Sequence, residues 1–381
     1  MDSGSNNGTR MLVTEDPKLV DPEEGDWSGL REIFERMFDE EQIKYFYSWM
    51  KRVLQALLSL MEFKGKIKWV PGNNNIPMSI QFFAMCGPVN CGKTWLQEAV
   101  ISEMLGGSAS PNQYMSEGTA FNSDLFRVPH QMISDAKGST SFEKRRAFGS
   151  FVKELVANDK HRCHGKGEKA IDLDPIWVVT ASCNTEPIER LRILPPLEKD
   201  IRDKMIITLI NPGKMPFNTS TPEGKESFRQ WTAYQLPAFA WWLLNEWTIP
   251  AEIAQEDRFG IKGYCHPRIE QQLLELSPDA KVRDYIHQAL FTTGGRQNRA
   301  WKGSAEQLAK YFDSEDGRKV LRGVKGQLPN VLSRLKQAFP EQFKRKKNDS
   351  QRFWVIEPPS WCDDEAEEDG TRGTKRNGTP V

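Results

Sequence analysis

Eight consecutive residues match the phosphate-binding loop pattern G-x-x-x-x-G-K-[ST]. They are Gly87, Pro88, Val89, Asn90, Cys91, Gly92, Lys93 and Thr94. Glycine at both ends of the loop lets backbone N–H groups approach phosphate oxygens. Lys93 would then reach the β- and γ-phosphates, and the Thr94 hydroxyl would hold Mg²⁺. The pattern predicts an ATP and Mg²⁺ site; the alternative is a glycine-rich turn that binds nothing.

The flanking segments support this prediction. Residues 79–86 form a short apolar run typical of a strand, and residues 95–105 have helical spacing of apolar side chains before Gly106 and Gly107. A strand, a glycine loop and a helix are the setting that the motif requires. The positive N-terminal end of that helix would face the phosphates.

Two further polar residues follow apolar runs that we interpret as strands. Asp135 follows residues 130–134, and we expect it to bind Mg²⁺; the alternative is an Asp that caps the next helix. Asn184 ends the run 176–183 and would contact the γ-phosphate or the attacking water. Its alternative is an Asn that starts the turn before Pro187.

A basic residue precedes a third apolar run. Arg202 lies just before residues 205–210 and could reach the γ-phosphate of a neighbouring subunit as an arginine finger. A surface salt bridge with Asp200 or Asp203 explains Arg202 equally well. We therefore expect Lys93, Asp135, Asn184 and Arg202 to be the catalytic set, with both readings of Arg202 open.

Two basic segments are candidates for DNA binding. Residues 141–170 carry eight Lys and Arg against four Asp and Glu, and residues 160–169 read as a glycine-containing loop or hairpin. Facing a pore, that loop would grip phosphates; the alternative is a solvated surface loop. The second segment is a strand-like run near the C-terminus. The candidate residues are Lys160, Arg162, His164, Lys166, Lys169, Lys344, Arg345, Lys346 and Lys347.

The elements that would position these residues suggest an α/β protein. We expect a P-loop AAA+-type ATPase core with a parallel sheet, an N-terminal helical region and a C-terminal winged-helix module. The winged helix would bind DNA or, alternatively, protein. The expected boundaries are a disordered N-terminus (1–26), a helical region (27–76), the core (77–215), a second helical region (216–300), the winged helix (301–359) and a disordered tail (360–381).

Composition sets limits on the class of protein. The 381 residues include 52 Lys and Arg and 52 Asp and Glu, and the zero net charge argues against a histone-like binder. Six scattered cysteines without a C-x-x-C pair predict reduced intracellular thiols. The most apolar stretch, residues 236–247, is too short to span a bilayer. We expect a cytoplasmic protein that binds no membrane.

The order of these motifs resembles the superfamily 3 helicases of viruses, phages and plasmids. The similar stretches are 87–94, 134–136, 161–170, 181–187, 194–206 and 258–267, and the helicase part of phage and plasmid primase-helicases is most similar. The resemblance implies a homo-hexameric ring that hydrolyses ATP between subunits and moves on single-stranded DNA. It implies the roles given above, with Arg202 acting in trans. Any primase or polymerase would be a separate chain.

One departure from the resemblance leaves alternatives open. The family has two adjacent acids where this chain has Ser134 and Asp135, so Glu143 or Glu186 would have to serve if a second acid is needed. The leading prediction is an ATP-dependent DNA helicase or translocase of a viral, phage or plasmid replication system. The runner-up is an ATP-gated initiator or loader that binds duplex or origin DNA with little turnover. A third is a related ATPase acting on protein or RNA.

Overall fold

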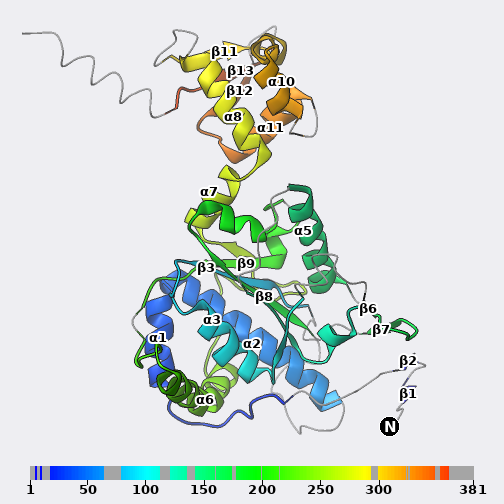
Figure 1. The fold of residues 1–381 in the computed structure, drawn as a ribbon, viewed down its shortest axis with the longest axis vertical. Coiled ribbons are helices and arrows are strands. Elements are labelled where there is room, and N and C mark those ends of the chain that lie inside the picture. Colours follow the sequence, from blue (N-terminus) through cyan, green and yellow to red (C-terminus); the bar gives the residue numbers. More distant parts are fainter. Residues whose placement is uncertain are drawn as a thin grey trace, which may run out of the picture. The chain divides into compact units, whose positions relative to one another are not determined.

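The protein is described from a computed structural model. The structure describes residues 5–6, 9–10, 18–63, 79–111, 121–134, 142–158, 160–173, 177–198, 200–213, 215–292, 299–322, 324, 327–347 and 352–359. The chain divides into two compact units, Met1–Leu273 and Leu274–Val381, called here the N-terminal and C-terminal units (Figure 1). Each unit is described by itself.

A six-stranded sheet is the centre of the N-terminal unit, in the order β10-β9-β3-β8-β5-β4. The strands are β3 (Phe82–Gly87), β4 (Ser108–Ala109), β5 (His130–Ser134), β8 (Val178–Asn184), β9 (Met205–Leu209) and β10 (Tyr264–Cys265). All five neighbouring pairs are parallel. The predicted α/β core with a parallel sheet is confirmed.

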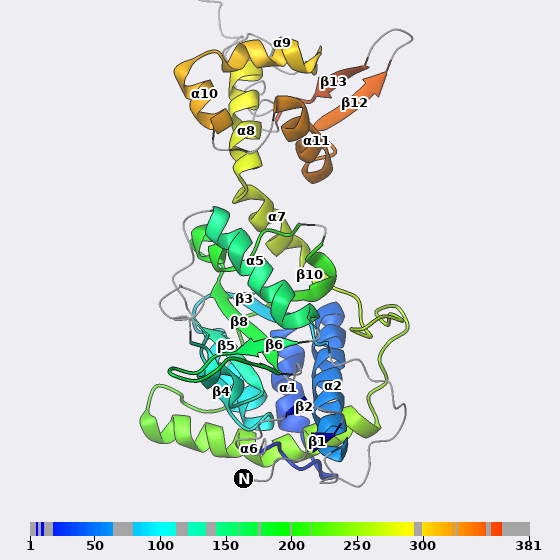
Figure 2. The ribbon, with the colours of Figure 1, turned by 90° about the vertical axis from the view of Figure 1, so that its right-hand side faces the viewer.

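The central strands are buried because helices cover both faces of the sheet. Every residue of β3 and β8 is buried, as expected for an all-parallel sheet whose crossover connections lie on its faces. One face packs against α1 (Ser28–Met37), α2 (Glu40–Phe63), α6 (Pro222–Asn245) and the helix that follows the phosphate loop (Figure 1). On the other face lies α5 (Phe142–Ala157) (Figure 2). The ring centroids of its Phe148 and of Phe82 in β3 are 6.0 Å apart.

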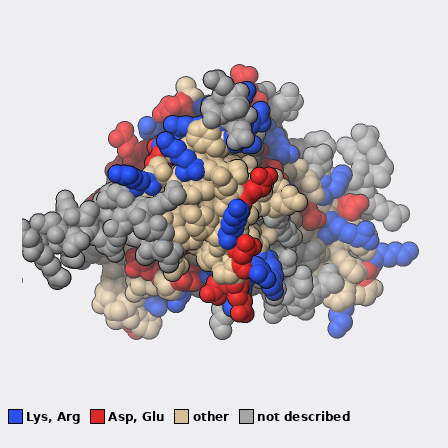
Figure 3. Space-filling view, turned by 90° about the horizontal axis from the view of Figure 1, so that it is seen from above, with Lys and Arg blue, Asp and Glu red and all other residues tan. Residues whose placement is uncertain are grey.

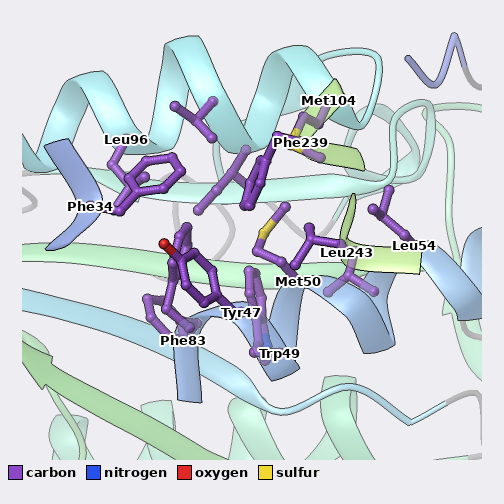
Figure 4. Close-up of a cluster of buried hydrophobic side chains, with 14 of the residues drawn as sticks. Phe34, Tyr47, Trp49, Met50, Leu54, Phe83, Leu96, Met104, Phe239 and Leu243 are labelled. Carbon is purple, nitrogen blue, oxygen red and sulfur yellow. The ribbon is translucent and has the colours of Figure 1, made fainter. Parts of the chain in front are cut away.

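The core under the helical layer is unusually aromatic. Figure 4 shows part of this core between the helices and the sheet: Phe34 and Tyr47 contact Phe239, and Trp49 contacts Phe83. Burying each such ring contributes on the order of 1.5–3 kcal/mol. Within the helical stripe predicted for residues 28–63, the apolar side chains from Leu30 to Leu57 therefore pack directly on the parallel sheet. Among the described residues, no helix is long and apolar enough to cross a membrane.

Shorter elements complete the N-terminal unit. They are the two-residue strands β1 (Ser5–Asn6) and β2 (Thr9–Arg10), the pair β6 (His161–Cys163) and β7 (Ile171–Leu173), and α7 (Pro267–Glu275), which runs across the division between the units. Three 3-10 helices are η2 (Ser123–Phe126), η3 (Ile188–Ile193) and η4 (Arg202–Lys204).

The C-terminal unit combines short helices with a three-stranded antiparallel sheet. Its helices are α8 (Pro278–His287), the π-helix η5 (Gln288–Thr292), α9 (Ala305–Ala309), the 3-10 helix η6 (Lys310–Phe312), α10 (Glu315–Arg322) and α11 (Leu328–Ala338). Its strands are β11 (Trp301–Gly303), β12 (Phe343–Lys347) and β13 (Arg352–Ile356), in the order β11-β13-β12. The unit thus has the helices and the basic hairpin that the sequence predicted. Its assignment as a winged helix stays a prediction.

Candidate nucleotide-binding site

The phosphate loop begins where the central strand of the sheet ends, at Gly87. A Cβ on this residue would lie 2.8 Å from both the Cys91 sulfur and the carbonyl oxygen of Ile210, so a side chain has no room. Gly92 has a φ of 91°, in the left-handed region that favours glycine. Both glycines of the motif are therefore required by the backbone that the structure shows.

Two methionine side chains lie beside the second glycine. A Cβ on Gly92 would collide with the terminal methyl group of Met215 and would lie 3.4 Å from the methyl group of Met37. Met37 is the last residue of α1, far from the motif in sequence. The N-terminal helical region thus forms part of the packing around the loop.

Lys93 is buried at the start of α3 (Lys93–Trp95) and folds back onto its own loop. Its ammonium donates to the carbonyl oxygens of Pro88 (2.6 Å) and Gly87 (3.2 Å). It also donates to Asn184 Oδ1 at 3.1 Å. The loop therefore already contains a buried cation whose contacts are weak, neutral acceptors that a phosphate oxygen can outcompete.

Asn184 joins Lys93 because of the strand register. β3 and β8 are paired so that Gly87 lies opposite Asn184, and the N–H of Thr185 donates to the Gly87 carbonyl oxygen at 3.1 Å. Asn184 is 6% exposed. Parallel strands end at one edge of the sheet, so two residues 97 positions apart (184 − 87) become neighbours of one loop.

A buried polar network that the sequence did not reveal lies behind the loop. Gln97, on the π-helix η1 (Leu96–Ser102) that continues α3, donates to Thr180 Oγ1 at 2.8 Å. Thr180 Oγ1 is 2.7 Å from His130 Nε2, and Ser102 Oγ is 2.8 Å from His130 Nδ1. Burial lowers the pKa of His130 to about 3. The only signal in the sequence was a glutamine on the apolar side of a predicted helix.

The expected magnesium ligands are only partly within the described residues. Thr94 is exposed in the first turn after the loop, where its hydroxyl is accessible. Asp135 lies outside the described residues; β5 ends at Ser134, opposite Ser182 of β8. The glycine-lined loop, the buried lysine and the exposed hydroxyl fit the phosphates and the metal of ATP.

Arg202 is not brought to the phosphate loop of its own chain. It lies just before β9, which runs parallel to β3, and so it is at the opposite edge of the sheet. At about 3.3 Å per residue, the six residues of β3 separate the two edges by roughly 20 Å. Arg202 forms an ion pair with Glu270 of α7. Within one chain, it therefore cannot act on the nucleotide.

The basic segment 160–169 forms a hairpin, with Arg162 of β6 opposite Asp172 of β7. Asn122 holds it at the base, where it accepts from the His164 N–H at 2.7 Å and donates to the Arg162 carbonyl oxygen at 2.9 Å. The expected lysines at 160, 166 and 169 are exposed, and so is Arg162, whereas His164 is half-buried.

The basic strand β12 of the C-terminal unit has few counter-charges. Lys344 pairs with Glu357 at 3.4 Å, and the Arg345 guanidinium lies 5.6 Å from the centre of the Trp354 ring. The register places Lys347 directly opposite Arg352 at the hairpin end. Like charges in that arrangement repel one another unless an anion is bound. On the face shown in Figure 3, basic and acidic side chains are interspersed.

The fold and this site together define an α/β protein with a phosphate-loop core. No family model matches the chain, and no curated protein does. Among solved structures, two apo structures of the NrS-1 C-terminal region match over 93% of this chain and 82% of theirs, with TM-scores of 0.47 and 0.48 and 11% and 12% identity. A JCV helicase with a bound thiazolopyridine compound matches over 67% of this chain and 68% of its own, with a TM-score of 0.31 and 14% identity. At these values the likeness says nothing about the chemistry of this chain.

Proposed function

We propose that this chain is an ATP-dependent DNA helicase or translocase of a viral, phage or plasmid replication system. The observation that carries the proposal is the contact between the Lys93 ammonium and Asn184 Oδ1 at 3.1 Å. A loop that only turns the chain needs neither a buried lysine nor a polar strand end beside it. A phosphate-binding loop that senses its nucleotide needs both.

Each residue of the site would have a separate role in ATP hydrolysis. Bound Mg²⁺–ATP would supply the electrophilic phosphorus and the free energy of hydrolysis. The backbone N–H groups between Gly87 and Thr94 bind the phosphates, and Lys93 exchanges its carbonyl contacts for phosphate oxygens. Asn184 then becomes free to orient the attacking water. Thr94 and Asp135 would hold the metal.

A ring of subunits, expected to be a hexamer, would complete the site. Arg202 lies about 20 Å from the loop of its own chain along β3. It can therefore neutralise transition-state charge only on a nucleotide bound by another copy. Its ion pair with Glu270 would have to open first, which would couple hydrolysis to assembly.

Single-stranded DNA is the proposed track, and duplex or origin DNA is a further partner. The exposed hairpin cations at 160–169 would face the pore, and Lys344, Arg345, Lys346 and Lys347 would hold the backbone outside it. Both surfaces offer exposed cations: Arg162, Lys166 and Lys169 on the hairpin, and Arg345, Lys346 and Lys347 on β12. A separate primase or polymerase would supply priming or synthesis.

ATP hydrolysis with and without single-stranded DNA tests the proposal. We expect DNA to stimulate turnover of the full chain, and Lys93→Ala to abolish it. Turnover that DNA leaves unchanged would contradict a translocating motor. ATP binding without turnover would instead favour the ATP-gated initiator or loader, a reading supported by Ser134 in place of a second acid beside Asp135.

A further inference from the structure

A hollow of about 400 Å³ opens on the C-terminal unit, and none of the residues that line it belongs to the set predicted from the sequence to bind DNA. Trp301 and Lys302 of β11, Gln307 of α9, and Lys310 and Tyr311 of η6 line it. β11 ends at Gly303, next to Lys302 in sequence. A Cβ on Gly303 would lie 2.5 Å from the Trp301 ring and 2.7 Å from Gln307 Oε1.

The chemistry of this hollow is cationic and aromatic. Lys302 and Lys310 are exposed, and neither has an ion pair within the described part of the chain. The Tyr311 side chain is 37% exposed. Its backbone is fixed, because the Tyr285 hydroxyl donates to the Tyr311 carbonyl oxygen at 3.0 Å. The hollow therefore presents two unpaired cations beside a ring on a fixed backbone.

The sheet register connects the hollow to the basic hairpin. Lys302 of β11 lies opposite Val355 of β13, and Val355 lies opposite Lys344 of β12. Side chains in one such row point to the same face, and so does Lys346, two residues along β12. Two strand spacings separate Lys302 from Lys344 by about 10 Å. The cations thus continue across the sheet from one edge to the other.

We propose that this hollow binds a nucleotide of single-stranded DNA, with a base stacked on Tyr311 and the adjacent phosphates held by Lys302 and Lys310. The strand would continue over Lys344 and Lys346. A base can stack on a side chain only when it is not stacked in a duplex, which favours a single strand. Cations that bind the phosphates and an exposed aromatic ring that stacks on a base are the two components of sequence-tolerant single-strand binding. The inference rests on the proposed function, and the hollow adds a binding site to it.

Oligonucleotide binding to the full chain, measured by fluorescence anisotropy over a range of salt concentrations, tests the site. We expect Lys302→Gln/Lys310→Gln to weaken binding about tenfold and to reduce the slope of log K against log salt by about 1.4, or 0.7 for each lost phosphate contact. Tyr311→Ala should weaken binding about tenfold, whereas Tyr311→Phe should bind as the wild type does.

A matched control removes the same charge elsewhere on this unit. Lys281 and Lys319 are exposed on α8 and α10, and Lys281→Gln/Lys319→Gln should leave the affinity and the slope unchanged. The inference is overturned if the hollow variants bind as the wild type does, if the control weakens binding equally, or if the wild type binds no single strand. ATP turnover of the wild type with and without single-stranded DNA, compared with Lys93→Ala, reports separately on the proposed function.

Discussion

The phosphate loop and the C-terminal basic sheet hold their cations in different ways. In the loop, one buried lysine is held by carbonyl oxygens within 3.2 Å, and glycines leave no space for a side chain. On the sheet, exposed cations alternate between the two faces of β12, and Lys347 lies opposite Arg352. We therefore expect anion binding by the loop to depend on the geometry of its backbone, and anion binding by the sheet to depend on its net positive charge. Changes in the loop should therefore have large, specific effects, and changes on the sheet small, salt-dependent ones.

Lys93→Ala should have the largest effect. Removing the buried ammonium that we propose binds the transferred phosphate should lower kcat by about a hundredfold or more. Steady-state ATP hydrolysis measures this, with a thermal melt to confirm folding. Lys225→Ala, an exposed lysine of α6, is the matched control. Wild-type turnover by the Lys93 variant would refute the geometric account of the loop.

Asn184→Ala should come next. The substitution removes the side-chain amide of Asn184 but leaves the Lys93 ammonium in place. We therefore expect kcat to fall about tenfold to a hundredfold with little change in KM. The split between kcat and KM separates a role in the reaction from a role in ATP binding. A large rise in KM with constant kcat would show that Asn184 only helps to bind the nucleotide.

Gly87→Ala tests the space around the loop. Its Cβ would meet the Ile210 carbonyl oxygen at 2.8 Å, so we expect a loss of about 1–3 kcal/mol in the free energy of unfolding. Gly167→Ala is the comparison, because no atom lies within 4 Å of its Cβ and only the φ of 77° is unfavourable. Equal losses in urea unfolding would mean that packing at Gly87 is unimportant.

Each unit also carries at least one buried histidine, His130 and His161 in the N-terminal unit and His287 in the C-terminal unit, and these should destabilise the units in acid. Burial lowers the pKa of His130 to about 3 and that of His287 to about 4, both below the ordinary 6.5. The unfolded chain then binds more protons below pH 6.5, so stability falls as the pH falls. Each histidine should contribute about 1.4 kcal/mol per pH unit between pH 6.5 and its folded pKa.

Urea unfolding between pH 7.5 and 5 measures this loss. His130→Gln, which retains hydrogen-bonding groups, should flatten the pH dependence of the N-terminal unit and leave that of the C-terminal unit unchanged. A pH dependence in His130→Gln as steep as in the wild type would show that other groups determine it.

Lys346→Gln/Lys347→Gln should have the smallest effect. We expect DNA affinity to fall severalfold at low salt, and the salt slope to decrease by about 1 for each lost duplex phosphate contact. Filter binding at 50 and 200 mM salt measures both quantities. An effect independent of salt would contradict the electrostatic account of the basic sheet.

The sequence predicted those parts of the site that depend on local pattern. The glycine spacing located the loop, and two apolar runs located Asn184 and the strand before Asp135, because strands of a parallel sheet end at one edge. The distance of Arg202 from the loop could not be read, since it depends on the parallel pairing and register of β9 with β3. The network of Gln97, Thr180 and His130 was missed because each residue comes from a different element.

The methionines beside the phosphate loop provide a way to observe it. Met215 and Met37 place their methyl groups against Gly92, the residue with the left-handed backbone just before Lys93. Selective ¹³C labelling of methionine methyl groups would make them NMR reporters without any added probe. Their chemical shifts should change when ATP binds and remain fixed in Gly87→Ala if that variant cannot bind it. The two methionine methyl groups can therefore report on the state of the loop by NMR, in the single chain and in an assembly.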